Sequence, residues 1–196
     1  MVTTSHPYSL RAEPRRVTLR DGNDVLLRPM QAEDGNALLR FFRRMPAADL
    51  YYLKEDVSSP RVIERWAKEL DYDRALPILA WAGNEVVADG TLHRQRAGAR
   101  RHMAEIRIVV DPKYRNLGLG TQILHELLTV AREASLERVY MELVAEREEG
   151  AVRAAEWWGF KRAAVLTSYA KDPDGKAHDV VLLDMPLADW FSGWPF

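Results

Sequence analysis

The sequence predicts a single domain of the α/β (mixed α+β) class. A mixed, mostly antiparallel sheet is expected to carry helices on both of its faces. Pairs of short apolar runs are joined by turn signals, as in antiparallel hairpins. Further along, strand-like runs alternate with amphipathic segments, as in β-α-β crossovers. The 196 residues, of which 47% are hydrophobic and 29% charged, can also bury a core without disulfides.

An N-terminal arm and a hairpin are expected first. Residues 1–15 contain two prolines and no apolar period, so we predict an arm there and one domain over residues 16–196. The apolar runs 17–19 and 25–27 flank Asp21-Gly22-Asn23-Asp24, a sequence typical of tight turns. Together they predict two short paired strands.

Two helices and a second hairpin are expected next. Apolar side chains recur at helical spacing over 33–45, where a proline then ends the segment. A second helix is predicted over 60–70, with a proline at its first position. The runs 76–81 and 86–92 are separated by Gly83-Asn84, which is typical of a hairpin turn.

The second half of the chain alternates strands with helices. The expected elements are a strand over 103–110, a long helix over 117–134, a strand over 138–144, a short helix over 148–158 and strands over 160–169 and 180–183. Helices that connect strands in this way pack on the faces of a sheet. This is why helices are expected on both faces.

Composition excludes several classes of function. A net charge of -1 does not suit a general nucleic-acid binder, and no apolar run approaches the roughly 20 residues of a membrane span. The chain has no cysteine, and its five histidines show no ligand-like spacing, so we expect no metal. The absence of a signal-peptide pattern and of cysteine predicts a cytoplasmic protein.

A glycine-bearing turn, Tyr114 to Thr121, opens the long helix directly after a predicted strand. The first N–H groups of a helix have no internal partner, and the helix dipole adds about half a positive charge, so such a turn can bind phosphate. Gly118 and Gly120 allow close approach, and Arg115 adds charge. The alternative is a helix start that only turns the chain, but two glycines there cost about 1 kcal/mol each relative to alanine.

Two common phosphate-binding motifs do not fit this turn. A Walker A loop needs a lysine immediately after its last glycine, and Thr121 stands there instead. A dinucleotide fingerprint needs a third small residue, and Ile123 occupies that position. ATP, GTP and NAD are therefore disfavoured as ligands.

The segment Arg115-Asn116-Leu117-Gly118-Leu119-Gly120 resembles the Gln/Arg-x-x-Gly-x-Gly/Ala signature of the GNAT superfamily of N-acetyltransferases. The preceding Val110-Asp111-Pro112, the later Trp157-Trp158-Gly159-Phe160 and the order of elements are also similar to that family. The resemblance implies a GNAT-like fold whose sheet is splayed around acetyl-CoA. It implies that pantetheine pairs with the end of the 103–110 strand and that pyrophosphate lies on the amides of the turn. The cofactor-binding residues implied in this way are Ile108, Val109, Val110, Arg115, Asn116, Leu117, Gly118, Leu119, Gly120 and Thr121.

Glu105 is the candidate catalytic residue. An amine must be neutral to attack a thioester, and Glu105 lies in an otherwise apolar strand, where desolvation could raise its pKa toward that of a general base. Ala104-Glu105-Ile106 also resembles the strand of protein-lysine acetyltransferases in which a glutamate is the base, directly or through water. The alternative is a structural carboxylate paired with Arg107.

Two residues that many relatives carry are missing. Ala155 stands where they have a tyrosine that protonates the thiolate, and Glu146-Arg147-Glu148-Glu149 replaces their asparagine after the fifth strand. Tyr169 could substitute if its strand points into the cleft, although an ordinary packed tyrosine is the alternative. A backbone amide near Val110 is expected to stabilise the oxyanion.

The N-terminal half is similar to stand-alone catalytic domains of bacterial protein-lysine acetyltransferases. We therefore expect an acetyl-CoA-dependent N-acetyltransferase whose acceptor is a protein lysine or a small-molecule amine, with the open segment between Met45 and Pro60 lining the acceptor cleft. We expect a monomer or homodimer, and no nucleic-acid or membrane partner. The rival interpretation is a non-catalytic acyl-CoA-binding regulatory module.

Overall fold

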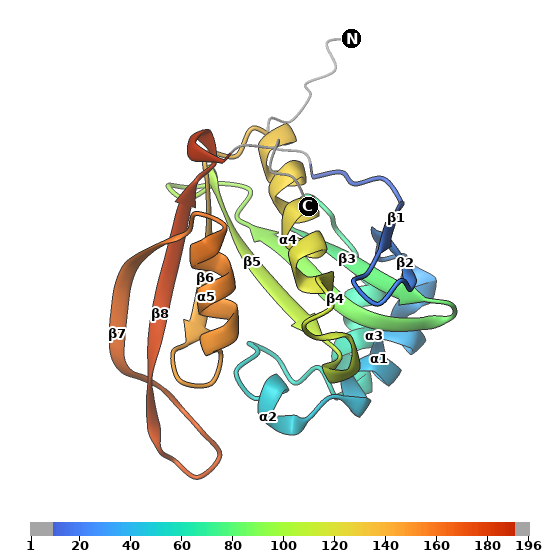
Figure 1. Ribbon diagram of the computed structural model, residues 1–196, viewed down its shortest axis with the longest axis horizontal. Helices are drawn as coiled ribbons and strands as arrows, with labels where there is room; N and C mark the ends of the chain where they lie inside the picture. Colours follow the sequence, from blue (N-terminus) through green and yellow to red (C-terminus); the bar gives the residue numbers. More distant parts are fainter. Residues whose placement is uncertain (1–9, 191–196) are drawn as a thin grey trace.

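The computed structural model describes residues 10–190, and one eight-stranded sheet, in the order β1-β2-β3-β4-β5-β6-β8-β7, forms its centre (Figure 1). The strands are β1 (Arg15–Thr18), β2 (Asp24–Pro29), β3 (Ala75–Ala82), β4 (Glu85–Arg94), β5 (Met103–Val110), β6 (Arg138–Val144), β7 (Lys161–Lys171) and β8 (Ala177–Pro186). Neighbouring strands are antiparallel except β5 and β6, which are parallel. The predicted mixed, mostly antiparallel sheet is therefore confirmed.

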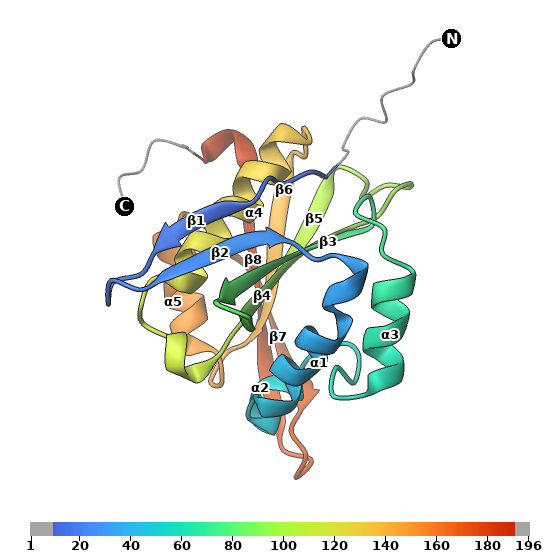
Figure 2. The ribbon, with the colours of Figure 1, turned by 90° about the vertical axis from the view of Figure 1, so that its right-hand side faces the viewer.

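Helices cover both faces of this sheet, as predicted (Figures 1 and 2). The helices are α1 (Gly35–Arg44), α2 (Ala47–Leu50), α3 (Pro60–Lys68), α4 (Leu119–Glu133) and α5 (Glu149–Trp157). The buried residues of α4 and α5 share one hydrophobic cluster with the sheet, and those of α1 and α3 belong to a second cluster. Helix α2 was not predicted, because a single turn of four residues is too short to show a helical period.

The sheet opens between β5 and β6. Strand β5 pairs with β4 from Ala104 to Val110, but it pairs with β6 only from Met103 to Glu105. In the part of the chain that the structure describes, the last five residues of β5 therefore have no strand partner on the β6 side. This opening is the splay that the sequence resemblance implied.

Helix α4 packs closely against β4 at Gly90. A Cβ atom at Gly90 would lie 2.1 Å from Cγ2 of the buried Ile123. Only glycine therefore allows α4 to approach the sheet this closely.

We expect Gly90→Ala to lower the free energy of unfolding by about 1–3 kcal/mol, because the added methyl group overpacks the core. Urea unfolding followed by circular dichroism measures this change. Gly150→Ala is the matched control: a Cβ at Gly150 meets no heavy atom within 4 Å, so that variant should be as stable as the parent or slightly more stable. Equal stability of the two variants would contradict the close packing.

The predicted arm is only partly within the described residues. Residues 1–9 lie outside them, and Leu10 is buried in the larger cluster, so the chain joins the core before β1 begins. Among the helices of residues 10–190, none combines the length and hydropathy that a membrane span requires.

Candidate active site

The loop after β5 is held in place at its first residue. The Asp111 side chain accepts a hydrogen bond from the Lys113 N–H at 3.0 Å, which begins the short 3-10 helix Pro112–Tyr114. Its other oxygen lies 2.9 Å from Nε of Arg44 on α1. Burial raises the pKa of Asp111, but the hydrogen bonds from Arg44 and Lys113 outweigh it and leave the pKa lowered. An ionised Asp111 thus ties the loop to α1.

The turn that opens α4 has the geometry of an anion site. Asn116 and Gly118 have φ values of 61° and 88°, in the left-handed region. Gln122 donates the first backbone hydrogen bond of the helix, to the Gly118 carbonyl at 3.0 Å. The N–H groups of helix residues 119–121 therefore have no acceptor within the helix. A Cβ at Gly120 would lie 3.7 Å from Cγ2 of Val110, so this turn sits directly beside the end of β5.

Arg115 has a different environment from the one expected. Its Nε donates to the Val110 carbonyl at 3.1 Å, and its guanidinium pairs with Asp49 of α2 at 2.5 Å. In this structure the side chain thus joins the loop to α2 rather than presenting a free charge to a phosphate. The sequence could not show this, because α2 itself was not predicted.

The predicted cofactor-binding positions come together in two adjoining parts. Residues 108–110 occupy the end of β5 that has no strand partner on the β6 side within residues 10–190, and residues 115–121 form the turn and helix start that follow it. The splay thus exposes the edge of a strand beside a helix N-terminus. An extended chain that carries phosphate groups fits this arrangement.

A cavity of about 320 Å³ lies on the side of the sheet that carries α1 and α3; we call it the α1–α3 pocket. Its apolar wall includes Leu38 and Phe42 of α1 and Trp66 of α3. Residues 53–55 and 57 also line it, which supports the expectation that the segment between Met45 and Pro60 borders a cleft.

The floor of the pocket consists of cross-strand pairs from β4 and β5. In order along the strands these pairs are Asp89 with Val109, Thr91 with Arg107, and His93 with Glu105. Residues two apart on a strand point to the same face, so all six side chains face the pocket. The end of β5 at the splay is therefore also one end of the pocket floor.

Glu105 is 4% exposed and is paired on both carboxylate oxygens. Lys54 Nζ lies 2.6 Å from Oε2, and Arg107 Nε lies 2.7 Å from Oε1. Burial raises the pKa of Glu105, but the hydrogen bonds and charges of Lys54 and Arg107 outweigh it, so the pKa is lowered. The expected rise was therefore wrong in direction, and the pairing with Arg107 that we considered as the alternative is present.

Asp89 and His93 line the pocket, and neither was predicted as a site residue. Burial raises the pKa of Asp89 to about 7, while a hydrogen bond from the Thr91 hydroxyl at 3.1 Å opposes the rise. Burial lowers the pKa of His93 to about 4, so this histidine is neutral at pH 7. Polar residues at alternate positions of an otherwise apolar strand were the signal that could have revealed them.

The position at which the sequence resemblance implies a tyrosine is occupied by Ala155. Ala155 is buried in α5, and Tyr169 on β7 is 70% exposed and does not line the pocket. Glu148 precedes α5, and its carboxylate accepts a hydrogen bond from the Val144 N–H at 2.6 Å. This contact satisfies the backbone of β6 where β5 is no longer paired with it.

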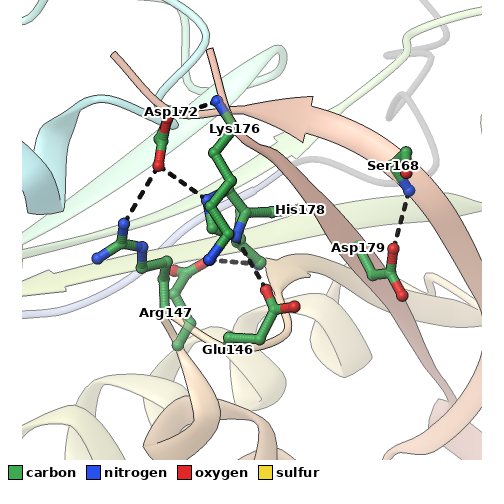
Figure 3. Close-up of polar contacts among 9 residues, drawn as sticks. Glu146, Arg147, Ser168, Asp172, Lys176, His178 and Asp179 are labelled. Carbon is green, nitrogen blue, oxygen red and sulfur yellow. Dashed lines mark hydrogen bonds and ion pairs between the residues drawn. The ribbon is translucent and has the colours of Figure 1, made fainter. Parts of the chain in front are cut away.

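The hairpin of β7 and β8 is fastened to the loop before α5 by the buried His178 (Figure 3). Its Nδ1 lies 3.0 Å from Glu146 and its Nε2 lies 3.1 Å from Asp172. Arg147 also reaches Asp172, at 3.4 Å. These contacts connect the β7–β8 hairpin to the loop between β6 and α5. They belong to the frame of the site and not to the pocket floor.

Within residues 10–190, no group of three or more His, Cys, Asp and Glu side chains is arranged to hold a metal ion. The helix start, the open strand edge and the pocket make up the candidate site.

Comparisons with known proteins agree with this geometry. A profile of the Acetyltransferase (GNAT) family matches residues 39–160. An acetyltransferase of Pseudomonas aeruginosa is 26% identical over 133 residues, which cover 63% of this chain and 68% of that protein.

Solved structures share the fold. A GNAT acetyltransferase from Streptococcus pneumoniae has a TM-score of 0.72 at 21% identity and covers 83% of this chain and 99% of its own. The GNAT domain of S. lividans PAT has a TM-score of 0.72 at 22% identity, covering 88% and 96%. An acetyltransferase from Salmonella typhimurium, solved with acetyl-CoA, has a TM-score of 0.72 at 16% identity, covering 88% and 98%.

Proposed function

The chain belongs to the acetyltransferase (GNAT) family, and we propose that it transfers an acetyl group from acetyl-CoA to a primary amine by direct attack in a ternary complex. The amine is a protein lysine or a small molecule. One observation carries this proposal: the open edge of β5, the start of α4 and a pocket lined by carboxylates all adjoin the end of β5. One substrate can therefore enter from each side of the sheet.

Acetyl-CoA fits the splay. In this proposal the N–H groups of residues 116–121 bind the pyrophosphate, and the pantetheine arm pairs with the open edge at residues 108–110. The thioester then lies near Val109 and Val110, where a backbone amide near Val110 stabilises the oxyanion. The thiolate of CoA leaves without a tyrosine acid, since Ala155 has no proton to give.

The amine enters through the α1–α3 pocket in this proposal. A lysine-like amine has a pKa near 10.4, so neutralising it at pH 7 requires about 4–5 kcal/mol. Because Glu105 is ionised, it attracts the ammonium form, and we propose that the acceptor replaces Lys54 on this carboxylate. The size of the cavity suits one side chain or a small amine.

The rival function is a non-catalytic acyl-CoA-binding module, and the absence of a tyrosine donor at Ala155 favours it. The test is release of CoA thiol from acetyl-CoA by the purified chain in the presence of phenethylamine, spermidine or Nα-acetyl-lysine amide. We expect saturable, amine-dependent release with at least one of them, or with a lysine-containing peptide. Tight binding of acetyl-CoA without release by any acceptor would favour the rival.

Removing the Lys54 amine should strengthen binding of the acceptor. We expect Lys54→Met to lower the KM for the amine about two- to fivefold, because the Lys54 side chain is mostly exposed, its pair with Glu105 is therefore worth only about 0.2–1 kcal/mol, and it no longer competes for that carboxylate. Steady-state kinetics at saturating acetyl-CoA measure the effect.

The matched control is Lys68→Met, which removes an exposed lysine at the end of α3 that does not line the pocket. Its KM should equal that of the parent. A Lys54→Met variant with an unchanged or higher KM would show that the acceptor does not bind at Glu105.

A further inference from the structure

The α1–α3 pocket contains a second buried carboxylate, Asp89, in addition to Glu105. It is 8% exposed and lies directly across the β4–β5 ladder from Val109. Residues opposed in this way have Cβ atoms about 4.5–5.5 Å apart, whereas Glu105 is four positions, or about 13 Å, from Val109 along β5. Asp89 is therefore the carboxylate nearer to the proposed thioester.

The surroundings of Asp89 differ from those of Glu105. Its cross-strand neighbours are Leu79 on one side and Val109 on the other, both apolar. The described residues give its side chain one hydrogen bond, from Thr91, and no ion pair. Asp89 lines the pocket, and its Oδ2 has no hydrogen-bond partner among residues 10–190, while both oxygens of Glu105 are bound by cations.

We infer that Glu105 attracts the incoming ammonium group first, and that Asp89 takes the proton from the acceptor nitrogen after that nitrogen has moved along the pocket floor to the thioester. This inference rests on the proposed function, since it assigns a step of the same reaction. It changes the role first expected for Glu105 from base to binding carboxylate.

The opposite pKa shifts of the two carboxylates support this division. Burial raises the pKa of Asp89 to about 7, close to that of an efficient general base, whereas the pKa of Glu105 is lowered. Of the groups on the pocket floor, His93 is neutral at pH 7 and Arg107 is held by Glu105. The other titratable residues that line the pocket are Lys54, Glu55, Glu69, Asp71, Arg74 and Arg94.

The proton balance is complete without a further reactant. The ammonium loses one proton to the Asp89 carboxylate, and the resulting amine attacks the thioester carbonyl carbon. The new C–N bond forms, the C–S bond breaks, and the second proton of the nitrogen passes to the CoA thiolate. Asp89 then returns its proton to solvent, so the products are one acetylated amine, one CoA thiol and one proton.

The test is Asp89→Asn, assayed with the amine of the panel that gives the highest kcat/KM. We expect kcat to fall at least 100-fold, in the range for loss of a general base, while the Kd for acetyl-CoA changes less than twofold. The rise of kcat/KM with pH near pH 7 should also disappear. Glu105→Gln should keep that rise and change mainly the KM for the amine.

Thr91→Val provides a second test that leaves the carboxylate in place. It removes the hydrogen bond that lowers the pKa of Asp89, so the rise in kcat/KM should move to higher pH. Valine is similar in volume to threonine, and this variant is the fallback if Asp89→Asn does not fold.

The outcomes separate the inference from the proposed function. If the parent acetylates amines and Asp89→Asn keeps its kcat and its pH profile, Asp89 is not the proton acceptor, although the function stands. If the pH dependence of kcat/KM in Thr91→Val is the same as in the parent, the inference is also overturned. If the parent binds acetyl-CoA but acetylates no acceptor, the proposed function fails and this inference fails with it.

Discussion

Replacing Gly120 with glutamate is expected to weaken binding of acetyl-CoA at least 100-fold. The backbone N–H of Gly120 is among those that have no acceptor within α4, and in the proposed complex it faces the pyrophosphate. A carboxylate at this position would face a like charge, which costs several kcal/mol, and about 2.7 kcal/mol corresponds to 100-fold. Isothermal titration with acetyl-CoA measures the loss.

Gly120→Ala separates charge from shape. A Cβ there makes only an ordinary contact, at 3.7 Å from Val110, so the fold should accept it. We expect the alanine variant to keep acetyl-CoA affinity within about tenfold of the parent (1.4 kcal/mol per factor of ten). Undiminished binding by the folded Gly120→Glu variant would show that the pyrophosphate lies elsewhere.

Glu105→Gln is expected to raise the KM for the amine at least tenfold while leaving the Kd for acetyl-CoA unchanged. The variant keeps the size of the side chain but removes the charge that attracts the ammonium group, and truncating one partner of a buried pair typically costs more than 2 kcal/mol. Glu64→Gln, an exposed change on α3, is the matched control and should leave the KM unchanged. An unaltered KM in Glu105→Gln would remove this residue from the acceptor site.

The same variant has a stability readout that does not depend on activity. Because the folded pKa of Glu105 lies below its ordinary value of 4.5, the ionised carboxylate stabilises the fold above about pH 4.5, and this contribution is lost as the pH falls below it. We expect Glu105→Gln to melt at a lower temperature than the parent at pH 7, with a difference that shrinks toward pH 3. A difference that does not vary with pH would contradict the ion pairs of Glu105.

Much of the fold was predictable because its signals are local. The glycine turns at Gly22 and Gly83 both occur where hairpins were predicted, with φ values of 84° and 57°. Strand β6 has the predicted bounds, because its apolar residues alternate between turn signals. Helix α2 and the pairing of Arg115 with Asp49 were missed, because one helical turn has no measurable period.

The surroundings of the two pocket carboxylates, Glu105 and Asp89, could not be predicted from the sequence. The position of Glu105 on a half-buried strand was predictable, but the direction of its pKa shift was not, because Lys54 is 51 residues away in the chain. Asp89 depends on a register that pairs β4 with both β3 and β5 and so surrounds it with Leu79 and Val109. Such pairings are set by the assembled sheet and not by neighbouring residues.

The most direct test of the account is transfer of an isotopically labelled acetyl group from acetyl-CoA to an amine, followed by mass spectrometry. We expect the amine to gain the labelled acetyl group, at a rate that saturates with both substrates and gives intersecting lines in double-reciprocal plots, as a ternary complex requires. Binding of acetyl-CoA with no labelled product from any small amine or lysine-containing peptide would contradict it. The chain would then be an acyl-CoA-binding module.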